Sequence, residues 1–414
     1  MNKATLPLAL SLCLPLFAAA QVTTDLQIGL DAWDLHPSVD ADTQANQSGN
    51  TRLFLANSNT AWPYQTVAPW VRFQGSARIL ADTQVTLKYR ADQSLGSHVD
   101  EFSVDQSYHS VGIRIGVLDY KTSWCRTYDV DSPWVRENDP FCTSRSTSRS
   151  ITAAPGYQLY ANRVQGDYKW QAVAGAYNPL AMNYDTGEFT NTVINNLSRV
   201  IENNKVGASI NVTHLENAFE MRLSILRTDQ SADVRENLIR PNYRIQQRVE
   251  VLYGGVSFNP TPAMNVRLTQ LQSTLNGTSF YPPGYARPDD TTAEVFYRDH
   301  SPKVSRVFEL NYQANARDVY SVAYSVYELR TDATDYFLSL PSMSQIEIQR
   351  PDQFFSRTNN PSLSWRRDWQ KGIFTVLQWS YAEVQSSTNL DSRFAAQQAA
   401  SNGHALGLRL GYRF

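Results

Sequence analysis

Long apolar runs are missing from most of this 414-residue chain, whose mean hydropathy is −0.42. A membrane-crossing helix needs about 20 consecutive apolar residues, and no such run follows the N-terminal segment. The sequence therefore argues against a helical membrane protein. It leaves room for a β-barrel, because barrel strands spread their apolar residues over alternate positions.

An excess of positive charge is also missing, since 37 Lys and Arg are balanced by 39 Asp and Glu to a net charge of −2. We therefore expect no nucleic-acid partner. The 6 histidines are scattered without a metal-ligand spacing, and no nucleophile-elbow or phosphate-loop motif occurs. We expect no metal, no cofactor and no catalytic residues, and thus no enzyme.

Residues 1–20 have the composition of a secretory signal peptide. Lys3 supplies the positive charge, residues 6–17 the apolar stretch and residues 18–20 the small-residue cleavage site. We expect an exported mature chain that forms one domain over residues 21–414.

Two cysteines, Cys125 and Cys142, remain after removal of that segment. An oxidising compartment favours a disulfide between them. Two free thiols or a metal pair are the alternatives, and no neighbouring histidine supports a metal.

Alternating apolar and polar residues, joined by short turns, recur along the chain. In residues 66–80, for example, Val71 and Phe73 fall on one face and Arg72 on the other. Seven such hairpins turn near residues 81–83, 109–110, 165–167, 216–217, 259–262, 315–318 and 368–372. With single strands at 26–33 and 405–414, the pattern predicts an all-β antiparallel barrel of about 16 strands, with 18 as the alternative count.

Longer polar connections separate the hairpins, at residues 34–65, 94–100, 121–154, 178–202, 228–244, 274–303, 329–360 and 385–402. Short turns on one side and long loops on the other are typical of transmembrane barrels. Aromatic residues near strand ends favour a girdle at the membrane interface: Tyr120, Tyr157, Tyr168, Tyr177, Trp365, Trp379 and Tyr412. A soluble sandwich or propeller is less favoured, because no blade-length repeat of about 40–50 residues is present.

The chain stops on an aromatic residue, Phe414, at the end of a strictly alternating strand. Leu406, Leu408, Leu410 and Tyr412 share one face of that strand. This segment resembles the C-terminal signal strand of bacterial outer-membrane barrel proteins. The resemblance implies recognition by the barrel-assembly machinery, contact with outer-membrane lipid and location in the Gram-negative outer membrane.

The layout as a whole resembles the general porins of Gram-negative bacteria, in which a long third loop folds into a 16-stranded barrel. Connection 121–154 occupies the corresponding place here. The resemblance implies passive diffusion of small hydrophilic solutes or ions through a water-filled barrel. It also implies a homotrimer, although connection 94–100, where general porins carry a subunit latch, is short.

Connection 121–154 has two interpretations: an exposed loop stapled by a disulfide, or a constriction inside the barrel. In the second, its acidic residues would oppose basic residues on the lumen-facing positions of the early strands, which creates a transverse field that filters polar solutes. The acidic set is Asp129, Asp131, Glu137 and Asp139, and the basic set is Arg72, Arg78, Lys88, Arg90 and Arg114.

A second functional hypothesis is a non-conducting barrel, closed by its loop, that serves as a structural scaffold, adhesin or docking partner.

The disulfide can be tested by titrating thiols in denatured, unreduced mature protein. We predict none, because both cysteines should be consumed by the bridge. Two titratable thiols per chain would contradict this.

Overall fold

The computed structural model describes residues 21–39, 67–92, 96–119, 153–177, 199–216, 218–234, 243–281, 293–339, 346–348, 352–388 and 397–414. The expected signal peptide, residues 1–20, lies outside this part of the chain. In the described ranges, no helix is long and apolar enough to cross a membrane. The strands are β1 (Gln21–Val39), β2 (Val67–Leu80), β3 (Thr83–Asp92), β4 (Gly96–Tyr108), β5 (Val111–Asp119), β6 (Ala153–Gln165), β7 (Tyr168–Tyr177), β8 (Arg199–His214), β9 (Phe219–Val234), β10 (Tyr243–Thr261), β11 (Met264–Tyr281), β12 (Ala293–Gln313), β13 (Asp318–Ser339), β14 (Ile346–Ile348), β15 (Asp352–Asp368), β16 (Ile373–Thr388) and β17 (Gln397–Arg413).

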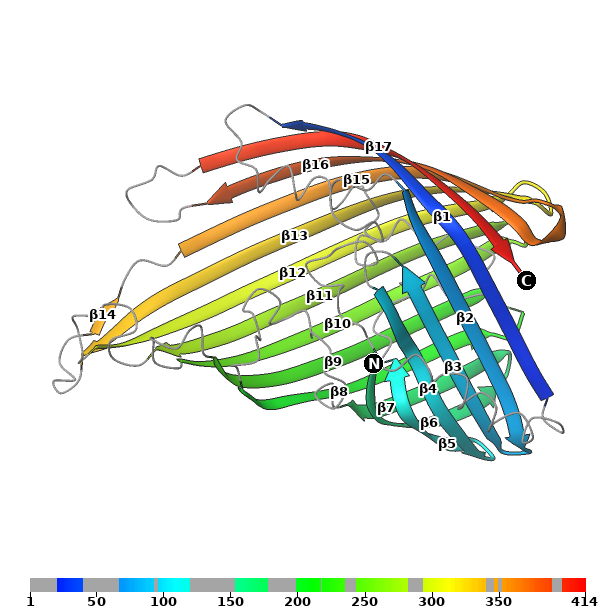
Figure 1. Ribbon diagram of the computed structural model, residues 1–414, viewed down its shortest axis with the longest axis horizontal. Helices are drawn as coiled ribbons and strands as arrows, with labels where there is room; N and C mark the ends of the chain where they lie inside the picture. The colour runs from blue at the N-terminus through cyan, green and yellow to red at the C-terminus, as the bar shows by residue number, and fades with distance from the viewer. Residues whose placement is uncertain are drawn as a thin grey trace.

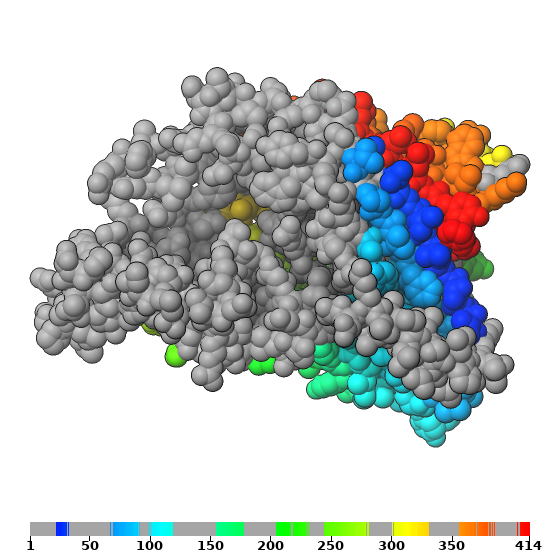
Figure 2. Space-filling model, in the orientation of Figure 1, coloured from blue at the N-terminus to red at the C-terminus, as the bar shows by residue number. Residues whose placement is uncertain are grey.

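All strands except β14 form one closed antiparallel barrel of 16 strands. Each pairs with its neighbours in sequence, and β13 pairs directly with β15. The sheet closes because β1 pairs with both β2 and β17, whose surfaces flank β1 in Figure 2. The short β14 pairs only with β13, near the far end of the long strands (Figure 1). The predicted all-β barrel is confirmed, with the lower strand count.

Apolar side chains cover the outside of the barrel. On β9, Leu223 and Ile225 are 48% and 53% exposed, whereas the intervening Ser224 and the following Leu226 are only 5% and 7% exposed. The other strands show the same outward apolar set, which includes Ile28, Leu30, Phe102, Val104, Ile115, Leu159, Ile210, Leu252, Leu268, Phe308, Val322, Leu363, Leu377, Leu406 and Leu410. An exposed apolar surface of this extent fits lipid rather than water.

Exposed aromatic residues mark the edge of the barrel that carries the tight turns. Tyr108, Tyr168, Tyr312 and Tyr320 are all at least 41% exposed and lie beside those turns, where amphipathic rings suit the lipid headgroups. Tyr177, predicted for the same girdle, is 5% exposed and points inward. That prediction was wrong because side chains alternate along β7, and Tyr177 falls on the face opposite the outward Tyr168 and Trp170.

The outer face of the long strands becomes charged beyond the apolar band. Asp229 lies 2.8 Å from Arg227 and 2.7 Å from Arg248. Glu328 similarly lies between two arginines, Arg306 and Arg357, at 3.5 and 3.8 Å. Exposed ion pairs of this kind stabilise a fold little. They are informative because of where they lie along the strands. They show where the strands leave the apolar environment and continue with polar residues on both faces.

This continuation corrects several predicted connections, which were too long. β13 runs to Ser339 instead of ending before residue 329, and β12 begins at Ala293 instead of after residue 303. The predicted bounds of connection 94–100 are also wrong, since β4 begins at Gly96. The physical reason is that backbone pairing does not need an apolar face, so the alternation ends before the strand does.

Two aromatic rings span the seam where the barrel closes. Trp70, Gly29, Gly411 and Phe374 are direct strand partners in one row across β2, β1, β17 and β16. The two rings lie on the inside with centroids 6.3 Å apart, and Arg72 and Arg409 stack on Trp70 at 4.7 and 5.6 Å. The glycines supply the room, because a Cβ on Gly29 would lie 2.5 Å from the Trp70 ring.

We predict that Gly29→Ala destabilises the folded barrel, by about 1–3 kcal/mol as expected for overpacking. The matched control is Gly254→Ala, where the nearest atom would be an ordinary 3.4 Å from the added methyl group. The measurement is the temperature at which the folded form loses its shifted mobility on an SDS gel. Equal temperatures for the two variants would contradict the packing of the seam.

Candidate functional site: a polar recess on the inner face of the barrel

The inner face of the barrel is mostly polar, and its character differs between two sectors. Across β12, β13 and β15 many of its side chains are small and uncharged, and Asn311, Ser321, Ser325, Thr358 and Ser362 are each at most 3% exposed, beside larger buried groups such as Glu309 and Tyr327. Hydrogen bonds join neighbouring side chains in a row. Ser321 donates to Asn311 at 2.5 Å, and Asn311 donates to the side-chain oxygen of Asn265 on β11 at 3.3 Å. Across β2 to β9 the inner face carries several charged side chains, and this part of the sheet is called the charged sector below.

The structure places the predicted basic residues in this charged sector, on β2, β3 and β5. Arg72 is 7% exposed against the Trp70 ring, and Arg78 lies nearer the tight turn and is exposed. Arg90 is the strand partner of Arg72, and its side chain is outside the described structure. The acidic set of Asp129, Asp131, Glu137 and Asp139, together with Cys125 and Cys142, also lies outside it.

Two acidic residues of β4 pair with this basic set and were not singled out from the sequence. Glu101 accepts from Lys88 at 2.6 Å, and both side chains are at most 12% exposed. Asp105 accepts from both Nε and Nη2 of Arg114, at 3.1 and 2.9 Å. Their signal was available, because both alternate with the outward Phe102 and Val104. Much of the positive charge is therefore balanced locally, within the sheet.

Tyr160 of β6 fixes the geometry around Arg114. Its hydroxyl donates to Asp105 at 2.5 Å, and the Arg114 guanidinium lies 5.9 Å from its ring centroid. The ring occupies the space above Gly112, where a Cβ would lie 2.3 Å from the ring. A glycine on β5 is thus required for the ring to hold this position.

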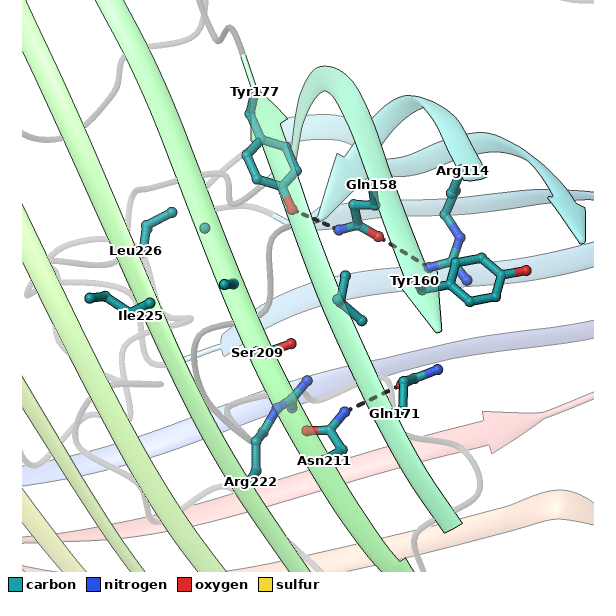
Figure 3. A pocket seen from close by; sticks show the side chains of 13 residues that line it. Arg114, Gln158, Tyr160, Gln171, Tyr177, Ser209, Asn211, Arg222, Ile225 and Leu226 are labelled. Carbon is teal, nitrogen blue, oxygen red and sulfur yellow. Dashed lines mark hydrogen bonds between the residues drawn. The ribbon is translucent and has the colours of Figure 1, made fainter. Parts of the chain in front are cut away.

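A recess of about 220 Å³ opens beside this group, on the inner faces of β5 to β9 (Figure 3). We call it the β5–β9 recess. It is lined by Arg114, Gln158, Tyr160, Gln171, Val173, Tyr177, Gly207, Ala208, Ser209, Asn211, Arg222, Ile225 and Leu226. Among the described residues, this lining contains two arginines and no carboxylate.

Amide side chains form one border of the β5–β9 recess. Asn211 donates to Gln171 at 3.3 Å, and Gln171 donates to Asn162 at 3.0 Å. These three residues are direct partners on β8, β7 and β6, and Arg222 of β9 is the partner of Asn211. Figure 3 shows the Arg222 side chain beside Asn211 and near Ser209.

The opposite border is set by Tyr177, whose hydroxyl accepts from Gln158 at 2.9 Å. Its ring extends over Gly175 of its own strand, where a Cβ would lie 2.6 Å from the hydroxyl oxygen. Gly207, the partner of Gly175 on β8, adds no side chain either. Sequence reasoning missed the recess, since it gathers residues from five strands.

The described ranges contain no cluster of three or more His, Cys, Asp or Glu side chains that could hold a metal ion.

Comparisons with known proteins find a likeness of architecture only. No family model and no curated protein matches the chain. OmpT of Vibrio cholerae in its trimer form is 8% identical, with 96% of this chain and 100% of that chain covered and a TM-score of 0.49. The outer membrane channel DcaP of Acinetobacter baumannii is 11% identical, with 96% and 98% covered and a TM-score of 0.47. An anion-selective porin from Comamonas acidovorans is 9% identical, with 95% and 100% covered and a TM-score of 0.46. The chain thus resembles outer-membrane porins at low sequence identity. The comparisons assign no solute to this chain.

Proposed function

We propose that the protein is a Gram-negative outer-membrane porin through which small hydrophilic solutes diffuse passively. The observation that carries this proposal is the inversion of polarity across the sheet, with half-exposed apolar side chains outside and mostly polar or charged side chains inside. A closed barrel satisfies its backbone hydrogen bonds internally and can therefore sit in lipid. Barrels of about 16 strands are wide enough to leave an aqueous channel.

Basic residues outnumber acidic residues on the inner face, which favours anions over cations. The inward basic residues of known placement include Arg72, Lys88, Arg114, Lys205, Arg222, Arg267, Arg409 and Arg413, against Asp25, Glu101, Asp105, Glu220 and Glu309. Charges inside a water-filled passage act on ions over roughly a Debye length, about 8 Å at physiological salt. We therefore propose a modest anion preference.

Connection 121–154 completes the proposed pore as a constriction. Its acidic residues would oppose the basic inner face near Arg72 and Arg114, and a Cys125–Cys142 bridge would limit its motion. A signal peptide over residues 1–20, assembly through the strand that ends at Phe414 and a homotrimeric state belong to the same proposal.

A second candidate function, a filled barrel acting as a scaffold or adhesin, is favoured by one observation. Inner side chains such as Ser321 and Ser325 are 2% and 1% exposed, whereas side chains facing open water are normally more accessible. Conductance separates the two candidates.

We predict stable single-channel steps when the folded protein is inserted into planar lipid bilayers. The physical reason is the charged inner face, which lowers the cost of moving an ion through the barrel. Folded protein, identified by its shifted mobility on an SDS gel, that inserts without producing steps would contradict the porin and support the scaffold.

We predict that Asp105→Asn increases the preference for chloride over potassium by removing an inner negative charge. The matched control is Asp229→Asn, which changes the net charge equally on the outer face and should leave selectivity within error. The measurement is the reversal potential in a KCl gradient, where a shift of a few millivolts is expected for Asp105→Asn alone. An equal shift in both variants would place the selectivity outside the inner face.

A further inference from the structure

The β5–β9 recess combines positive charge with small size. Its two ionisable groups of fixed charge are the guanidinium groups of Arg114 and Arg222, on the first and last of its five strands. A volume of about 220 Å³ is below the range of roughly 300–1,000 Å³ that holds drug-sized ligands. The recess therefore suits an anion of a few heavy atoms.

Arg114 is held in place from behind, and its remaining edge faces the recess. Asp105 of β4, which does not line the recess, engages Nε and Nη2. The Nη1 atom is 3.5 Å from Gln158, at the limit of a hydrogen bond. A ligand oxygen can replace this weak contact at little cost.

Arg222 lies at the other end of the recess, beside the amide border. It is 9% exposed and is the strand partner of Asn211. Guanidinium and amide groups are planar donors, and the guanidinium fork matches the two oxygens of a carboxylate. Because the surroundings already exclude most water, such a contact is stronger here than on an open surface.

Apolar side chains complete the lining, and they favour an organic anion over an inorganic one. Val173 and Leu226 border the recess, and Leu226 packs in a buried cluster with Leu118 and Tyr177. Inorganic phosphate would leave this surface without a partner, whereas a short carbon chain would cover it.

We propose that the β5–β9 recess is a binding subsite for small organic carboxylates on their way through the barrel. The proposal rests on the porin function and adds its class of solute. Arg222 would bind one acidic group, Arg114 at the other end would bind a second where the solute carries one, and the amide border would hold additional polar atoms. Val173 with Leu226 would contact the carbon chain.

The test is isothermal titration of the folded, detergent-solubilised protein with succinate, with inorganic phosphate and glycerol as comparison solutes. We expect saturable succinate binding that Arg222→Gln weakens on the order of tenfold, the effect of losing one charge-assisted hydrogen bond. Arg227→Gln is the matched control, since it removes the same charge from the outer face of the same strand. Arg114→Gln is a second inner variant, used if Arg222→Gln lacks the mobility shift of a folded barrel.

Each outcome decides the proposal. The proposal is supported if the inner variants bind succinate more weakly and the Arg227→Gln control binds it as the unchanged protein does. Absent succinate binding, equal effects in inner and outer variants, or tighter binding of phosphate or glycerol than of succinate overturns it. Conductance of the same preparation in KCl identifies which claim has failed, because channel steps without succinate binding remove only the subsite, whereas missing steps remove the porin.

Discussion

Backbone hydrogen bonding in lipid is the constraint on which the rest of the structure depends. Inside a bilayer, every peptide group must find a partner within the protein, and a sheet can do this only by closing on itself. Here the pairing of β1 with β17 and β2 removes the two free edges. Once the sheet is closed, its side chains must divide between lipid and interior, which produces the outward apolar band and the polar inner face.

Closure also needs tight packing where the first and last strands meet. The seam meets this need by pairing large rings with glycines, so that Trp70 and Phe374 approach each other across Gly29 and Gly411. The same arrangement recurs at Tyr160 with Gly112 and at Tyr177 with Gly175. At the seam it stabilises closure, and at the β5–β9 recess it positions two of the lining tyrosines. One packing device thus serves both stability and the candidate site.

The sequence predicted the barrel because lipid demands apolar residues at every second position of a strand. That demand made it possible to recognise the hairpins and to count the strands, and it placed Arg72 and Arg114 on the face opposite Val71 and Ile115. Outside the apolar band a strand no longer needs apolar residues at alternate positions. The start of β12 and the end of β13 were missed for this reason. The β5–β9 recess could not be predicted, because only the registers of five strands bring Arg114 and Arg222 to the lining of one recess. Tyr177 was misplaced for a related reason, since an aromatic near a strand end is read as interfacial until its parity is known.

Accessibility along β9 tests the central claim, inversion of polarity around a water-filled interior, most directly. Spin labels would be placed singly at Leu223 and Ile225 on the outer face and at Ser224 and Thr228 on the inner face, in protein reconstituted into bilayers. Collision with oxygen, which concentrates in lipid, should be high for the outer pair, and collision with a water-soluble nickel complex should be high for the inner pair. Inner labels shielded from the nickel complex would contradict the account, because they would show an interior closed to water.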